Sequence, residues 1–531
     1  MTQPTQEQLK ELIELYQSGK LDEAEMEVQK LLKQFPNDLT CLNILGVLTD
    51  RKGQTEEAIK IYQKALQINE NSPETHFNVG SIFHRLGRSN EARISYEKAI
   101  SAKSDFLNAH FNLGLVYQNL QDNKKAIESY ENAIKLKPDF HQAIGAMGTA
   151  LQAQGELDEA IEHYKKAVAI QPDARNHFNL GAGLRTKGAL DEAIEQFEKS
   201  LSFDKENPET LTSLGDALWH KKGEADKAIE KFDEALKIDP NHSQANYNLG
   251  VFLSVNNKLG EAFIHFERSK IHDWQERALY CLYKTEEYEK FKEKLDIVIA
   301  NKKNNSPFLA TLSKHYAVNF GEEDQYNFCK SPLDFVGHFT IKELAKPDSP
   351  LLKQLLKDVH VVKIAERMQS RLHHGKQSAG NLFKRSENSF VTLSKLIAET
   401  IKKYYEQKKS NEKNSIFINE FPDKVEFNSS WYVMMKQGGH LDSHIHEEGW
   451  ISGACYLSIP KERKNPNEGA ITLSVHGDNY PKKHDNFLEK TILPKVGDVV
   501  FFPSSVFHHT IPFSSNEERI CIAFDVKPEV V

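Results

Sequence analysis

The chain has 531 residues, of which 27% are charged and 39% hydrophobic, and its mean hydropathy is −0.57. These values are typical of a globular protein, and no stretch approaches the roughly 18 apolar residues that a membrane-spanning helix needs. The net charge of −8 argues against general nucleic-acid binding, which requires a basic face.

The N-terminal residues and the cysteines indicate where the protein works. The segment MTQPTQEQLKELIELY has neither the basic region nor the apolar region of a secretory signal. The five cysteines are scattered and form no CxxC pair, so they predict neither a disulfide framework nor a thiolate zinc site. We expect a cytoplasmic protein with no membrane partner.

A 34-residue repeat fills the first half of the chain. Gly46, Gly80, Gly114 and Gly148 are spaced at 34 residues, and the series continues at steps of 33 to 35. An alanine follows each glycine by 12 or 13 residues, and a Tyr or Phe follows that alanine by four. Small residues at two fixed positions allow two helices to approach closely, and the ring fills the space beside them. The pattern predicts a repeated two-helix unit.

This pattern resembles the tetratricopeptide repeat (TPR), with about eight copies from residue 5 to residue 276 and a degenerate copy at 277–300. The resemblance implies a right-handed solenoid whose concave face binds a peptide or a partner protein.

Asparagines recur at one position of the repeat, two residues before the glycine, at Asn78, Asn112, Asn179 and Asn248. Helix interiors disfavour asparagine, whereas a side-chain amide can both donate to and accept from a peptide backbone. Asparagines at the matching position line the groove of several peptide-binding arrays of this family. These asparagines therefore either line a peptide groove or only belong to the repeat consensus.

The pattern changes beyond residue 300. Residues 349–360 and 391–408 have helical spacing, and five short runs rich in Val, Ile, Tyr and Phe predict strands at 427–435, 452–459, 470–475, 498–502 and 520–526. Five strands in about 100 residues indicate an antiparallel sandwich or jelly roll. We therefore expect an α + β multidomain chain with a solenoid at 1–300, a link at 301–317 and a strand-rich domain at 318–531.

Histidines gather in the strand-rich domain. The segment GGHLDSHIHEEG carries His440, His444 and His446, and the carboxylates Asp442, Glu447 and Glu448 lie among them. Residues two apart on an extended segment project to the same side, so His444 and His446 can converge on one ion. His508 and His509 follow further along, and imidazoles from separate strands commonly hold a redox-active metal. The alternative is that these histidines lie on loops and bind nothing.

From about residue 318 onward the chain resembles the Fe(II)- and 2-oxoglutarate-dependent oxygenases that are fused to TPR arrays. The matching segments are NFCKSPLDFV (327–336), GKQSAGNLF (375–383), HIHEEGWISGACYLSIP (444–460), GDVVFFPSSVFHHTIPF (497–513) and ERICIAFDV (518–526). The resemblance implies a double-stranded β-helix with supporting helices, Fe(II) at its mouth, 2-oxoglutarate as cosubstrate and O2 as oxidant.

The resemblance also implies residue roles. His444 and His508 would be iron ligands, and Arg519 would pair with the C5 carboxylate of 2-oxoglutarate, a task that suits a guanidinium. The superfamily places Asp or Glu two residues after the first histidine, where this chain has His446. We prefer His444 with His446, then His440 with Asp442, then His446 with Glu448.

Three further residues could contact the cosubstrate. Cys521 stands where the family usually has a serine two residues after the arginine, and a thiol donates hydrogen bonds only weakly. Tyr432 and Tyr456 could form walls of the cosubstrate pocket, although aromatic residues on strands more often belong to the core.

The sequence thus predicts an Fe(II)- and 2-oxoglutarate-dependent dioxygenase, or hydroxylase, whose repeats recruit a peptide or protein. Two other readings stay open. The chain could be a non-catalytic scaffold with a degenerate jelly roll. It could also be a hydrolytic metalloenzyme, although HIHEEG lacks the HExxH spacing.

Overall fold

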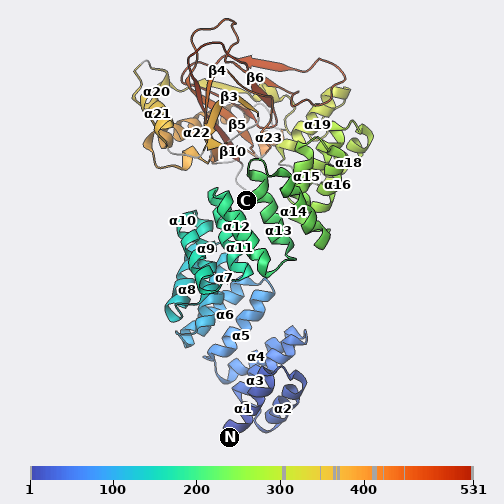
Figure 1. Cartoon of the computed structure of the whole chain (residues 1–531), viewed down its shortest axis with the longest axis vertical. Coiled ribbons are helices and arrows are strands. Elements are labelled where there is room, and N and C mark those ends of the chain that lie inside the picture. Colours follow the sequence, from blue (N-terminus) through green and yellow to red (C-terminus); the bar gives the residue numbers. More distant parts are fainter. Residues whose placement is uncertain are drawn as a thin grey trace. The chain divides into compact units, whose positions relative to one another are not determined.

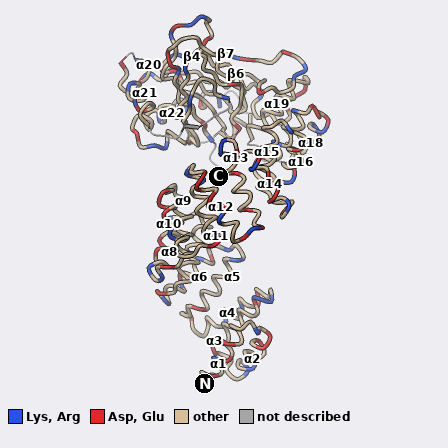
Figure 2. The backbone as a smooth tube through the Cα atoms, in the orientation of Figure 1, with Lys and Arg blue, Asp and Glu red and all other residues tan. Residues whose placement is uncertain are grey.

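The computed structural model describes residues 3–301, 306–346, 348–362, 366–367, 371–378, 380–409, 415–421, 424–447 and 449–527. By internal contacts the chain divides into two compact units, residues 1–245 and 246–531 (Figure 1). Acidic and basic positions are interspersed along both units (Figure 2). Among the described residues, no helix has the length and apolar character needed to cross a membrane.

Helix pairs form at every predicted repeat. The repeat helices are α1 (Gln6–Gln17), α2 (Leu21–Gln34), α3 (Leu39–Arg51), α4 (Thr55–Ile68), α5 (Pro73–Arg85), α6 (Ser89–Ala102), α7 (Leu107–Asn119), α8 (Asn123–Leu136), α9 (His141–Gln154), α10 (Leu157–Ile170), α11 (Ala174–Lys187), α12 (Leu190–Phe203), α13 (Pro208–His220), α14 (Ala225–Ile238), α15 (Ser243–Val255) and α16 (Leu259–Ser269). The degenerate copy is also a helix pair, α17 (Trp274–Lys284) and α18 (Tyr288–Asn301).

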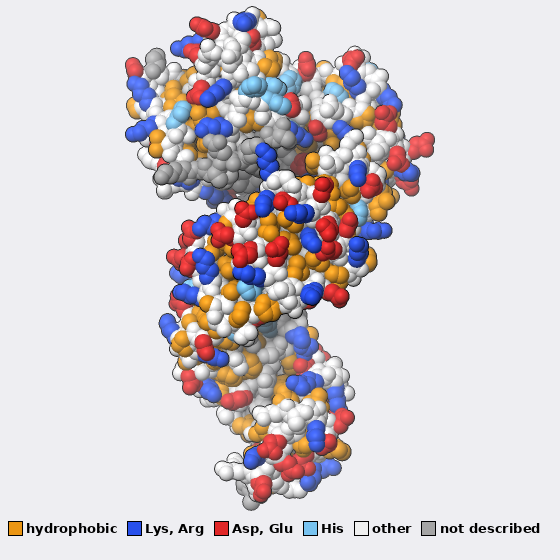
Figure 3. Space-filling view, viewed as in Figure 1, with side chains coloured by type: hydrophobic (Ala, Val, Ile, Leu, Met, Phe, Trp, Pro, Cys, Tyr) orange, Lys and Arg blue, Asp and Glu red, His pale blue; other side chains and the backbone are white. Residues whose placement is uncertain are grey.

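Steric contact between the two helices of a unit explains the glycine and ring positions of the repeat. A Cβ atom on Gly80 would lie 2.8 Å from the ring of Tyr96, and one on Gly181 would lie 2.8 Å from the ring of Phe197. Real Cβ atoms do not approach so closely, so only glycine lets the first helix of a unit rest on the ring of the second. Figure 3 shows charged and hydrophobic side chains mixed over the visible face of these repeats.

Two antiparallel sheets form the strand-rich part of the second unit. The larger sheet has the order β1-β8-β5-β10-β4-β3-β2, and the smaller has the order β7-β6-β9. The strands are β1 (Gly337–Thr340), β2 (Glu366–Arg367), β3 (Leu372–Ser378), β4 (Glu426–Leu441), β5 (Ile451–Ser458), β6 (Ile471–Ser474), β7 (Glu489–Ile492), β8 (Asp498–Pro503), β9 (Phe507–Thr510) and β10 (Arg519–Lys527). The five predicted strands are confirmed as β4, β5, β6, β8 and β10, in agreement with the predicted jelly roll.

Helices cover the outer face of the larger sheet. They are η1 (Pro332–Phe335), α20 (Lys342–Ala345), α21 (Pro350–Val361), η2 (Leu382–Lys384), α22 (Asn388–Lys409) and α23 (Ile416–Asn419). Helix α19 (Pro307–Phe320) instead packs beside α17, and its Thr311 hydroxyl donates to the Ser505 carbonyl at 2.8 Å. Ile397 and Ile401 of α22 share a core with Ile522 and Phe524 of β10. A second core, with Val433 and Leu473, fills the space between the two sheets. The predicted helices at 349–360 and 391–408 are confirmed as α21 and α22.

The predicted link at 301–317 differs from the structure. Most of it belongs to α19, in which Leu309 and Leu312 are fully buried. Leu279 of α17 and Leu295 of α18 lie in the same hydrophobic core as the larger sheet. The last repeat helices therefore fold with the sheets, and the compact units divide near residue 245 rather than at residue 300.

Candidate metal and cosubstrate site

Backbone pairing holds two of the candidate ligands opposite each other. His444 follows β4, and its N–H donates to the His508 carbonyl at 3.1 Å, while the His508 N–H donates back at 2.9 Å. His508 lies on β9 of the smaller sheet. The segment that follows β4 of the larger sheet is thus paired with β9 of the smaller sheet. This pairing holds the two imidazole rings with their centroids 4.2 Å apart.

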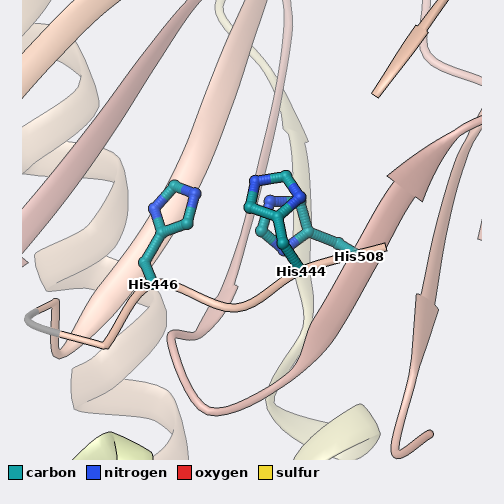
Figure 4. Close-up of side chains that lie close together, drawn as sticks. All are labelled: His444, His446 and His508. Atoms are coloured by element: carbon teal, nitrogen blue, oxygen red, sulfur yellow. The ribbon is translucent and has the colours of Figure 1, made fainter. Parts of the chain in front are cut away.

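His446 completes the cluster from the same segment as His444. Its N–H donates to the Ser504 carbonyl at 3.3 Å, and its ring faces the other two with centroids at 5.3 Å from His444 and 4.9 Å from His508 (Figure 4). One ring nitrogen from each histidine lies within 4.8 Å of those of the other two. The group that the structure brings together contains imidazoles and no carboxylate ligand among the described residues.

Each histidine uses its Nδ1 atom for support. The Nδ1 atoms of His444 and His508 lie 2.7 Å from the Asp442 carbonyl and 3.4 Å from the Val506 carbonyl, and that of His446 lies 2.6 Å from Asp525 Oδ1. These acceptors fix the tautomer with the proton on Nδ1. Three Nε2 lone pairs are therefore left to hold one ion.

Burial keeps the cluster in its ligating form. His444 is 6% exposed and His508 is 8% exposed. Burial, with the neighbouring His446, lowers the pKa of His444 to about 3, and burial also holds the pKa of His508 well below its usual value. Both imidazoles are neutral at neutral pH, which is the state that binds metals.

An acidic side chain beside His446 ties the ligand segment to a repeat helix of the same unit. Glu447 accepts a hydrogen bond from Arg277 Nη2 at 2.7 Å. Arg277 of α17 is itself held by Asp273 at 2.9 Å and by the Tyr247 hydroxyl at 2.9 Å. This network orients the segment that carries His446.

The three histidines line a cavity of about 50 Å³ together with Arg519, Tyr456 and Cys521. A single water needs roughly 10–15 Å³ on this scale, so the cavity has room for a small molecule. Arg519 is 2% exposed, and its Nε donates to the Gly469 carbonyl at 3.1 Å. Its Nη1 lies 3.9 Å from the sulfurs of Met435 and Cys521. A guanidinium so deeply buried, without a carboxylate partner among the described residues, favours an anionic ligand.

The cavity wall carries two buried polar atoms, one of Tyr456 and one of Gln377. The hydroxyl of Tyr456 and Oε1 of Gln377 have no hydrogen-bond partner among the described residues. Because an unpaired buried polar atom costs on the order of 1–3 kcal/mol, their position indicates a polar guest. Sequence reasoning missed Gln377, although it lies in the matching segment GKQSAGNLF.

Tyr432 does not line the cavity, so its predicted place there is wrong. Its strand neighbours Trp431 and Val433 line the cavity, whereas Tyr432 packs in the core beneath the outer helices. Adjacent strand residues face opposite sides of a sheet, and Tyr432 lies on the helix side. The metal role of Glu448 falls outside the described residues.

His440 and Asp442 lie apart from the three converging histidines. They form a second, more exposed group with His373, whose Nε2 lies 2.8 Å from Asp442 Oδ2. The side chain of Asp442 therefore turns to His373, and its backbone carbonyl supports His444. Whether His444, His446 and His508 bind metal stays a prediction.

The repeat asparagines are all half-buried. Asn78 Nδ2 lies 3.5 Å from Asn43 Oδ1, and Asn112 Nδ2 donates to the Tyr96 hydroxyl at 3.3 Å. In the first unit, Asn179 lines a cavity of about 250 Å³ with Arg175. Asn248 lies on α15. Their role in peptide binding stays a prediction.

Comparison with known families matches both parts of the chain. The family described as "Putative 2OG-Fe(II) oxygenase" matches residues 429–525. Families described as TPR or tetratricopeptide repeats match residues 51–87, 80–121, 107–140, 139–206, 178–243 and 231–263. The chain joins a TPR array to a domain of the 2OG-Fe(II) oxygenase family.

Solved structures similar to this TPR–oxygenase chain match over part of its length. MamA is 30% identical over 30% of this chain and 93% of its own, with a TM-score of 0.28. YrrB, titled a TPR protein with an unusual peptide-binding site, is 25% identical over 35% of this chain and 95% of its own, with a TM-score of 0.29. PilF of Pseudomonas aeruginosa is 17% identical over 39% of this chain and 94% of its own, with a TM-score of 0.35. No curated protein matches the chain.

Proposed function

We propose that the protein is an Fe(II)- and 2-oxoglutarate-dependent dioxygenase whose repeats recruit a peptide or protein substrate. The observation that carries this proposal is one cavity that joins three histidines to a buried arginine with no carboxylate partner among the described residues. A metal site and an anion site in one small cavity match the needs of a metal-chelating dicarboxylate.

The residues present fit both groups. His444, His446 and His508 would hold Fe(II) through Nε2. The Arg519 guanidinium, and the Tyr456 hydroxyl that has no partner among the described residues, can donate to a carboxylate-bearing guest. When bound, Fe(II) and 2-oxoglutarate supply the activation of O2 for substrate oxidation.

The chain's own contribution is orientation and exclusion of water. Arg519 would pair with the C5 carboxylate through parallel N–H donors, with the ring of Tyr456 centred 5.1 Å from its guanidinium carbon. The apolar side chains of Val433, Ile471 and Phe502 line the same cavity. They lower the local dielectric, which strengthens each charged contact.

The repeats support a macromolecular substrate. TPR arrays generally bind peptides or proteins, and the cavity beside Asn179 and Arg175 offers amide and guanidinium donors to an extended backbone. We place the protein in the cytoplasm, because its five cysteines are scattered along the chain and show no spacing typical of a disulfide framework.

The test is succinate formation from 2-oxoglutarate by anaerobically purified, Fe(II)-loaded protein after O2 is admitted. We expect the wild type to form succinate and the double variant His444→Ala, His508→Ala to form none. The repeat fold of the variant, monitored by circular dichroism, serves as the control. Absence of 2-oxoglutarate turnover in an iron-loaded wild type would instead favour a non-catalytic scaffold.

A further inference from the structure

Among the described residues, the histidine cluster has no carboxylate ligand, which would offset part of the charge of a divalent ion. Three neutral imidazoles around Fe(II) leave a net charge of two, whereas a carboxylate ligand would leave one. Two of the three Nδ1 atoms meet backbone carbonyls, which are neutral. The Nδ1 atom of His446 alone meets a carboxylate, that of Asp525, at 2.6 Å.

The fold holds Asp525 firmly beside His446. Asp525 lies on β10 and is 8% exposed, between Ser429 of β4 and Ser452 of β5 in the strand register. Ser452 Oγ donates to Oδ1 at 2.6 Å, and Ser429 Oγ donates to Oδ2 at 2.9 Å. Hydroxyl groups from both neighbouring strands thus solvate the buried anion, and its ion pair among the described residues is with His446.

The surroundings leave little freedom to this carboxylate. A Cβ atom on Gly449, close to His446 in the chain, would lie 3.1 Å from Asp525 Oδ1 and 2.6 Å from Ser504 Oγ. The register of β10 against β4 shifts between Asp525 and Val526, and such irregularities re-aim a side chain. Glycine at 449 lets the ligand segment pass directly over the carboxylate.

We propose that Asp525 is a positioning residue of the metal site. Its carboxylate, which meets Nδ1 of His446, supplies the negative charge that the ligand set lacks. This inference rests on the proposed metal site. The Asp525 carboxylate fixes the His446 tautomer with Nε2 toward the ion, and it makes the imidazole a stronger ligand for the metal.

The same strand places both charged residues of the site. Arg519, Cys521 and Ala523 of β10 line the cavity, and Asp525 follows with the same alternation. The charges of Asp525 and Arg519 cancel each other, so the site with a divalent ion keeps a net charge of two. A 2-oxoglutarate dianion would neutralise it.

The experiment measures Co(II) affinity by chelator competition, with the Co(II) absorption spectrum as a second readout. Asp525→Asn keeps the shape and can still accept from His446, but it removes the charge. We expect its Co(II) affinity to fall 10- to 100-fold, the range typical of outer-shell partners, with a changed spectrum. Asp525→Ser serves the same purpose if the Asn variant does not fold.

The matched control is Asp498→Asn. Asp498 is also buried, at 3% exposed, and pairs with His338 Nε2 at 2.8 Å, away from the cavity. It should lose thermal stability as Asp525→Asn does, yet bind Co(II) like the wild type. A purely structural Asp525 would make the two variants behave alike.

A second background tests the charge itself. His446→Asp returns a carboxylate to the ligand set, so in that background Asp525→Asn should no longer weaken Co(II) binding. Wild-type affinity in Asp525→Asn alone would overturn the inference and leave the proposed function standing. Metal binding without 2-oxoglutarate turnover would remove the function and leave the role of Asp525 standing, whereas a wild type that binds no metal would overturn both.

Discussion

Arg519 is the residue whose substitution most directly probes the cosubstrate. We expect Arg519→Lys to keep its iron, because the arginine is not a ligand, but to lose at least tenfold in affinity for 2-oxoglutarate. One ammonium cannot reproduce two parallel donors, and each charge-assisted bond contributes roughly 1.5–3 kcal/mol. Isothermal titration calorimetry of anaerobic Fe(II)-loaded protein measures the change.

Arg385→Lys is the matched control for that substitution. Arg385 pairs with Glu387 on the surface of the same unit, so its replacement should leave 2-oxoglutarate binding unchanged. Equal binding by Arg519→Lys and by the wild type would remove Arg519 from the site.

At the residue scale, the sequence predicts what lies close in the chain and misses what the sheet brings together. The spacing of His444 and His446 predicts that they converge on one ion; their ring nitrogens lie within 4.8 Å of each other, and ion binding stays a prediction. Gln377 and Asp525 were missed, because each joins the site from a different strand through pairing that no local motif records. Tyr432 was misplaced because sequence alone does not show which face of β4 points inward.

At the element scale, helix α9 allows a matched test of close packing between repeat helices. A Cβ atom on Gly148 would lie 2.7 Å from the ring of Tyr164, whereas one on Gly145 would meet nothing nearer than Asn176 Oδ1 at 3.5 Å. We expect Gly148→Ala to destabilise by about 1–3 kcal/mol through overpacking. Gly145→Ala should be neutral or stabilise by up to about 1 kcal/mol through helix propensity. Urea unfolding measures the change in unfolding free energy of both variants. Equal changes would contradict this explanation of the glycine position in the repeat.

The buried His315 of α19 predicts acid sensitivity of the second unit. It is fully buried, with Nδ1 at 2.7 Å from the Tyr283 hydroxyl and Nε2 at 2.8 Å from His476 Nδ1. Burial, with contributions from His476, His484 and Lys284, lowers its pKa to about 3. In the unfolded chain this histidine has a pKa near 6.5, so below that pH it binds a proton that it does not bind in the folded chain.

The stability that His315 contributes is therefore complete above about pH 6.5 and declines as the pH falls toward 3, by up to about 1.4 kcal/mol per pH unit. His315→Gln should flatten the dependence of unfolding free energy on pH between 6 and 4. His360→Gln, at an exposed position of α21, is the control variant. If His315→Gln left the pH dependence of the unfolding free energy unchanged, His315 would not be the source of the acid sensitivity.

Elements with a long, regular pattern were predictable. The repeat period predicts α1 to α16, and β-branched runs predict the five main strands. The four-residue strands β1, β7 and β9 are too short to establish an alternation. Helix α19 is buried on nearly all sides, so it has no polar stripe by which helical periodicity is recognised.

At the scale of the whole molecule, the shared core predicts where the chain can be cut. A fragment of residues 1–241 ends after α14 and should unfold cooperatively as a helical monomer. A fragment of residues 1–304 keeps α17 and α18 but loses the sheet side of their core, so Leu279, Tyr283 and Leu295 become exposed. We expect it to aggregate or to exchange the amide hydrogens of α17 and α18 rapidly.

Hydrogen exchange and gel filtration of both fragments measure this difference. A fragment 1–304 in which α17 and α18 are as protected as in the full chain would contradict the shared core. The repeat period alone could not predict the division, because α17 and α18 still form a repeat-like pair while their buried faces serve the second unit.

The central claim is that one cavity binds both Fe(II) and 2-oxoglutarate through this chain's histidines and Arg519. The most direct measurement titrates 2-oxoglutarate into anaerobic Fe(II)-loaded protein and follows the visible charge-transfer band expected of this family. We predict a saturable band in the wild type, and no band in the His444→Ala, His508→Ala double variant. A wild type that holds iron but gives neither a band nor 2-oxoglutarate binding would contradict the account.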